Sequence, residues 1–153
     1  MKKTIVVLLT AILLSACNSD DGNSIIEQQS FVVPPPALLL NTWSLTGGER
    51  DDGGILLIDD CISEELDFMT NRDFYRKFIA TRADSDPITC ITTESEGIFY
   101  VNPEKTEVTT IIGLNKVVRK IVKLDENELH LKMISSTNNE LFIDFTIFYT
   151  KVN

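Results

Sequence analysis

The three cysteines carry the clearest chemistry in this sequence, and Cys17 stands at an abrupt change in composition. Residues 4–14 are apolar apart from the threonines, whereas residues 18–21 (NSDD) are polar and then acidic. A thiol is the most nucleophilic common side chain once it ionises, so it forms thioethers readily. The position of Cys17 therefore suits covalent modification of its sulfur.

The segment before Cys17 has the layout of a secretory signal peptide. Lys2 and Lys3 form a basic start, residues 4–14 form an apolar core, and Ser15 and Ala16 supply small residues. The apolar core is about half of the roughly 20 residues that a membrane-spanning helix needs. We therefore expect a cleaved signal over residues 1–16 and no permanent transmembrane helix there.

The four residues Leu14-Ser15-Ala16-Cys17 resemble the lipobox of bacterial lipoproteins. That resemblance implies cleavage before Cys17 and acylation of its sulfur and its new amino group by chains such as palmitate. Each buried methylene adds about 0.8 kcal/mol of membrane affinity, so several chains anchor stably. The alternative is an ordinary signal peptide with an incidental cysteine.

Ser19-Asp20-Asp21 resembles the acidic tripeptide that some Gram-negative lineages place after the lipidated cysteine. The resemblance implies an outer-membrane lipoprotein, anchored through Cys17, on the outward face of that membrane. The alternative is that a solvated tether is polar and acidic in any case. The membrane is thus the first expected partner.

The charge of the chain excludes one class of partner. The net charge is −9, and loss of Lys2 and Lys3 with the signal would lower it by two charges, to −11. Nucleic-acid binding needs a basic face toward the phosphates, so no nucleic acid is expected. Electrostatic docking on anionic lipid is disfavoured for the same reason.

Residues 17–36 have the composition of a flexible tether that follows the lipidated cysteine. Residues 18–31 are mostly polar, and the three consecutive prolines 34–36 favour an extended polyproline conformation. A proline-rich docking motif for a partner is the alternative. The folded domain is therefore expected over residues 37–153, after a short helical turn near 36–40.

Alternation of apolar and polar residues dominates this domain and predicts strands. Leu129, Leu131 and Met133 alternate with Glu128, His130 and Lys132, as in a half-buried strand. Spacings of about 8–12 residues with turn signals between them indicate an antiparallel sandwich or barrel. The predicted strands lie near 41–48, 54–59, 65–70, 74–81, 96–101, 106–112, 117–124, 128–135 and 141–151, and 54–59 can equally be a loop.

Cys61 and Cys90 are the cysteines that remain once Cys17 is lipidated. The cell envelope is oxidising, so a disulfide between them is the natural interpretation. It would tie the segment before the strand near 65–70 to the loop after the strand near 74–81. A metal-binding pair and two free buried thiols are the alternatives.

The domain resembles the small bacterial lipocalin-like lipoprotein domains. Residues 39–43 (LLNTW) resemble their opening leucine, glycine, x, tryptophan element, with Asn41 in place of the glycine. Cys61 and Cys90 fall where the group often has paired cysteines, and residues 97–100 (GIFY) resemble its glycine-plus-aromatic strand. The resemblance implies an all-β, antiparallel, up-and-down barrel of eight strands that holds a small apolar ligand.

We therefore expect an interior that binds one small hydrophobic or amphipathic molecule. The same side chains fit a solid core equally well. In that case the barrel would be an interaction module, either an inhibitor or an accessory subunit for another envelope protein. The expected ligand-binding residues are the inward set Trp43, Leu66, Phe68, Leu129, Leu131, Phe145 and Ile147.

The sequence holds no recognisable catalytic constellation, so an enzyme, a cofactor and a metal are not expected. His130 is the sole histidine, and its position in the alternation of its strand predicts that its side chain points outward. The acidic loop 49–54, followed by Asp59 and Asp60, lacks the EF-hand spacing and is interpreted as solvated, with calcium as the alternative. Two basic clusters are interpreted as solvated strand edges, with a site for an anionic ligand or glycan as the alternative. The first cluster is Arg72, Arg76, Lys77 and Arg82, and the second is Lys116, Arg119, Lys120 and Lys123.

Overall fold

The computed structural model describes residues 33–56, 58, 61–82, 89–137 and 144–153. The predicted signal peptide, Cys17 and most of the predicted tether lie outside the described residues. Within them, Val33 forms an isolated antiparallel bridge with Val101. No helix of the described part is long and apolar enough to cross a membrane.

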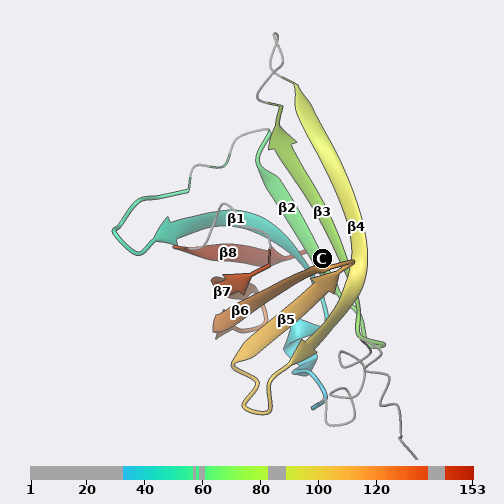
Figure 1. Ribbon diagram of the computed structural model, residues 1–153. Coiled ribbons are helices and arrows are strands. Elements are labelled where there is room, and N and C mark those ends of the chain that lie inside the picture. The colour runs from blue at the N-terminus through green and yellow to red at the C-terminus, as the bar shows by residue number, and fades with distance from the viewer. Residues whose placement is uncertain (1–32, 57, 59–60, 83–88, 138–143) are drawn as a thin grey trace, which may run out of the picture. The chain divides into compact units, whose positions relative to one another are not determined.

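Among these residues, eight antiparallel strands form a closed barrel in the order of the chain (Figure 1). The last strand pairs with the first, from Trp43↔Lys151 to Arg50↔Phe145, with a bulge between Leu45 and Gly47. The predicted eight-stranded up-and-down barrel is thereby confirmed. The strands are β1 Thr42–Arg50, β2 Ser63–Phe68, β3 Asp73–Thr81, β4 Cys90–Val101, β5 Glu107–Ile112, β6 Asn115–Leu124, β7 Glu128–Ser136 and β8 Phe145–Lys151.

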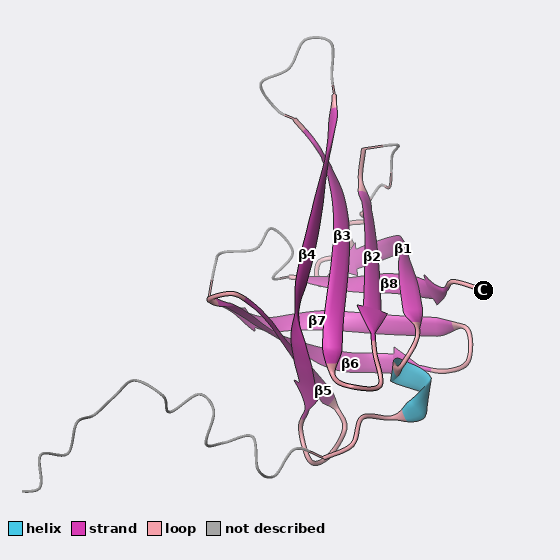
Figure 2. Cartoon of the chain, turned by 90° about the vertical axis from the view of Figure 1, so that its right-hand side faces the viewer, coloured by secondary structure: helices cyan, strands magenta, loops and turns pink. Residues whose placement is uncertain are grey.

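One end of the barrel interior is a packed apolar core. The 3-10 helix η2, Ala37–Leu39, lies beside that end (Figure 2), and its Leu39 is fully buried. The indole Nε1 of Trp43 donates a hydrogen bond of 3.1 Å to the Leu39 carbonyl, which satisfies the one polar atom of that side chain. Above it the rings of Phe68, Phe74 and Phe99 pack with centroids 5.0–5.1 Å apart.

Two of the predicted strands differ clearly from the structure. Around 54–59, where a strand or a loop was predicted, the described residues form a loop with a single bridge, Glu49↔Ile55, after a turn at Gly53 with φ +88°. Strand β4 begins at Cys90, six residues before the predicted start near 96. Residues 141–143 of the predicted last strand lie outside the described residues.

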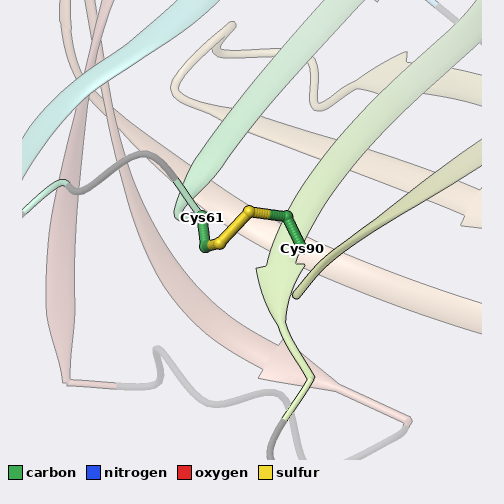
Figure 3. Close-up of a disulfide and its surroundings, with 2 residues drawn as sticks. All are labelled: Cys61 and Cys90. Carbon is green, nitrogen blue, oxygen red and sulfur yellow. A yellow bond between two sulfur atoms is a disulfide. The ribbon is translucent and has the colours of Figure 1, made fainter. Parts of the chain in front are cut away.

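Cys61 and Cys90 form the predicted disulfide (Figure 3). Cys61 precedes β2, and Cys90 is the first residue of β4, paired with Thr81 of β3. The bridge therefore joins two strands that flank β3, and Cys90 does not lie in a loop as predicted. Closing the 29-residue separation contributes about 3–4 kcal/mol on the chain-entropy account.

Strand β4 is longer than its partner β5, which leaves an overhang of residues 90–97. It pairs with β3 from Cys90 to Ile98 but with β5 only from Ile98 to Val101. Beyond that point β3 and β4 extend past the β5–β6 hairpin (Figures 1 and 2). The overhang is where the interior of the barrel opens.

Gly97 marks the point where β4 leaves β5, and the close approach there requires glycine. A Cβ atom at Gly97 would lie 2.0 Å from the carbonyl oxygen of Ile111 and 2.9 Å from its carbonyl carbon. Neither is a flexible side-chain atom, so the two strands would have to separate.

We predict that Gly97→Ala destabilises the barrel by about 1–3 kcal/mol, as overpacking does, in urea unfolding. Gly47→Ala is the matched control, since a Cβ there makes only an ordinary contact, 3.7 Å from Phe148. Equal midpoints for Gly97→Ala and the unchanged protein would show that the strands are not this close.

Candidate functional site

The seven side chains predicted to line a ligand cavity are packed core. Trp43, Leu66, Phe68, Leu129 and Leu131 are at most 2% exposed, and Phe145 packs against the same cluster. Leu131 and Ile147 line a cavity of about 10 Å³, which is near the minimum that holds one water molecule. The aromatic rings and leucines of the described residues pack closely at this end of the barrel.

A larger cavity, of about 220 Å³, lies in the other part of the interior. Its walls come from strands β3, β4, β5 and β6, and none of the seven predicted residues contributes. Thr93, on the β4 overhang, is exposed, so the cavity opens to solvent there. The lining residues are Phe74, Arg76, Thr93, Ser95, Thr110, Ile112, Asn115, Val117 and Arg119.

Strand register brings these side chains together. Arg76 pairs with Ser95 across β3 and β4, and Thr110 pairs with Val117 across β5 and β6. Since residues two apart on a strand share a face, Thr93 joins Ser95, and Arg119 joins Val117. The cavity thus lies between the β4 overhang and the turn end of the β5–β6 hairpin.

A buried carboxylate, Glu64 of β2, holds one of the two arginines. Arg76 Nε donates to Glu64 Oε1 at 2.5 Å, and the Tyr149 hydroxyl donates to Glu64 Oε2 at 2.5 Å. Glu64 is only 5% exposed, and a charge at such depth needs both a counter-ion and hydrogen bonds. The guanidinium of Arg76 also lies 4.9 Å from the ring centroid of Phe78.

The second arginine, Arg119, enters from the opposite wall and is 6% exposed. Its Nη1 donates a hydrogen bond of 3.0 Å to Thr110 Oγ1. Both arginines also line the small cavity that contains Glu64 and Tyr149. The two arginines are therefore common to the walls of both cavities.

The pKa of Tyr149 is raised well above its usual value of 10.0. Burial is the main cause, the charge of Glu64 adds to it, and Arg119 acts in the opposite direction. The Tyr149 hydroxyl consequently stays protonated at neutral pH and remains a donor to Glu64.

Sequence reasoning missed Glu64, Thr110 and the role of Tyr149, although a signal for them exists. Glu64 shares its parity with Leu66 and Phe68, and Arg76 shares its parity with Phe74. A charged residue on the buried parity of a strand is the pattern to look for. The prediction did assign Arg76 and Arg119 to two basic clusters that could hold an anion, and the structure brings these two residues into one cavity.

The other predicted candidates within the described residues form local contacts, and Asp59 and Asp60 of the acidic loop lie outside the described residues. The ring of His130 lies 4.5 Å from that of Phe148, with its Nε2 3.4 Å from Glu128. In the acidic loop Asp52 pairs with Arg50, and Asp51 accepts two bonds of 2.7 Å from Lys132. Among the described residues no group of three or more His, Cys, Asp or Glu side chains could hold a metal ion.

Comparison with family models and with curated proteins finds no match. Among solved structures, the chain is similar to a lipocalin-like protein from Bacteroides uniformis ATCC 8492, with a TM-score of 0.52. The two share 16% sequence identity over 75% of this chain and 99% of that chain. Together with the closed barrel, this likeness shows a lipocalin-like β-barrel fold.

We predict that Tyr149→Phe lowers the free energy of unfolding by about 1.5–3 kcal/mol, because a buried carboxylate loses a donor. Urea unfolding at neutral pH measures this. The unchanged protein should also lose stability as the pH rises from about 10, the unfolded pKa, through the higher folded pKa of Tyr149. The Phe variant should lose less over that range.

Tyr100→Phe is the control for this prediction, since it removes a hydroxyl from the half-buried face of β4. If both variants unfolded at the same urea concentration as the unchanged protein, the Glu64 network would contribute nothing to the fold.

Proposed function

We propose that this protein is a lipid-anchored envelope protein whose barrel binds one small amphipathic molecule. The lipocalin-like fold supports a binding role, and such folds are typically non-enzymatic. The observation that carries the proposal is the cavity of about 220 Å³, with apolar and polar residues on its walls. An apolar cavity of about 150 Å³ can hold benzene, so this one suits a ring or a short alkyl chain.

In this proposal the packed end of the interior stabilises the fold, and the end with the larger cavity binds the ligand. The core around Trp43 and η2 gives the barrel its stability, and the cavity beneath the β4 overhang receives the ligand. Phe74, Ile112 and Val117 offer an apolar wall, while Thr93, Ser95 and Asn115 offer hydrogen bonds. Ligand sites are commonly apolar pockets with a few placed polar groups, and this composition matches that description.

Native mass spectrometry of the full chain, purified from the envelope of an expression host, tests the binding. We predict extra mass that leaves on denaturation. Ser95→Phe should abolish it, because Ser95 lines the cavity and a phenyl ring would occupy that space. Thr92→Phe is the matched control, since the neighbouring Thr92 is exposed and has the opposite parity.

A bare mass that persists after incubation with an extract of envelope lipids and metabolites would contradict ligand binding. It would favour the alternative, a barrel that acts by contacting another envelope protein.

The anchor is proposed from the sequence around Cys17, with cleavage after Ala16 and an outer-membrane location. We predict that cells fed labelled palmitate attach the label to the unchanged chain and not to Cys17→Ser. A double variant, Cys61→Ser with Cys90→Ser, removes the other two thiols and should keep the label. Label on the Cys17→Ser chain would show that this position is not the anchor.

A further inference from the structure

The cavity beneath the β4 overhang has a definite electrostatic character. The ionisable side chains on its walls are Arg76 and Arg119, and no acidic side chain is among its described lining residues. This contrasts with the chain as a whole, whose net charge is −9. A molecule that enters the cavity therefore meets two guanidinium groups inside an otherwise acidic protein.

Glu64 offsets one of the two positive charges at the cavity, because it pairs with Arg76 at 2.5 Å. It lines the small cavity of about 10 Å³ and is not among the lining residues of the larger one. Its oxygens accept bonds from Arg76 and Tyr149. One carboxylate therefore faces two arginines, and a ligand with one negative charge would balance the cluster.

The neutral groups nearby are able to donate hydrogen bonds. Thr110 Oγ1 accepts from Arg119 Nη1, so its own proton is directed elsewhere, since a hydroxyl both accepts and donates. Ser95, Thr93 and Asn115 add further donors around the cavity. Such a set is complementary to an acceptor-only group. The guanidinium fork matches the two oxygens of a carboxylate in particular.

We infer that the ligand is a small monocarboxylate with a compact apolar body, an inference that rests on the proposed binding function. Its carboxylate contacts Arg119 and the hydroxyl groups, and its hydrocarbon lies against Phe74, Ile112 and Val117. One negative charge suits a half-apolar cavity of this size better than two, because each buried charge must be desolvated.

Isothermal titration of the purified full chain with octanoate, octanol and octylamine tests the inference, since these probes share one alkyl chain. We expect octanoate to bind at least tenfold more tightly than octanol, on the scale of a charged hydrogen bond, and octylamine to bind least. This comparison needs no variant, so it holds even if a substitution prevents folding.

Arg119→Gln should lower octanoate affinity roughly tenfold to a hundredfold and leave octanol affinity unchanged. Lys120→Gln is the matched control, because it removes the same charge from the exposed face of the same strand. It should leave all three affinities unchanged.

The outcomes distinguish failure of the carboxylate inference from failure of the proposed ligand binding. Equal binding of the three probes would overturn the carboxylate inference and leave the barrel a ligand-binding protein. A parallel loss of octanoate and octanol affinity in Arg119→Gln would likewise overturn the role of Arg119. If no probe bound, and native mass spectrometry showed no ligand, the inference would fail together with the proposed function.

Discussion

Burying the carboxylate of Glu64 inside a barrel costs free energy of desolvation. The hydrogen bonds and the ion pair that offset this cost determine how the polar side chains of the interior are arranged. A buried carboxylate requires a cation and hydrogen bonds, and here Arg76 and Tyr149 supply them from β3 and β8. These three residues come from strands that closure of the barrel brings to one level. Once Arg76 is held in this way, its guanidinium becomes a fixed part of the cavity wall.

An eight-stranded barrel is just wide enough for its side chains to fill or for one small ligand. In this barrel, side chains fill one level of the interior, and a cavity of about 220 Å³ lies at another. Trp43, Leu39 and the three packed phenylalanines fill one end. The overhang of β4 begins at Gly97, where the pairing with β5 ends, and residues of this overhang line the larger cavity. The Cys61–Cys90 bridge joins the strands on either side of β3 near the end of that overhang.

More of the fold than of the candidate site could be predicted from the sequence. Alternating apolar residues and turn signals indicated an antiparallel sandwich or barrel, because these are local signals. The resemblance to lipocalin-like domains then selected the eight-stranded barrel, and the pair Cys61 and Cys90 indicated the disulfide. The start of β4 was missed because residues 90–95 lie on an overhang with little burial, so they lack the apolar alternation of a core strand.

The candidate site was predicted only in part, because its residues come from separate strands and the contact of Tyr149 with Glu64 forms only when the barrel closes. Arg119 lies on β6, where Val117 and Val118 are both apolar and bulges shift the register, so parity does not show that it points inward. The residues predicted to line a ligand cavity lie in the packed core, for a related reason. Alternation identifies which side chains face the interior, but their fit to one another decides which part of that interior stays open.

A crystal structure of the protein with octanoate bound tests the central claim most directly. We expect ligand density in the cavity of about 220 Å³, with the carboxylate at Arg119, the alkyl chain against Phe74 and Val117, and Glu64 still bound by Arg76 and Tyr149. A cavity closed by rearranged side chains, with octanoate absent or bound on the outer surface, would contradict it.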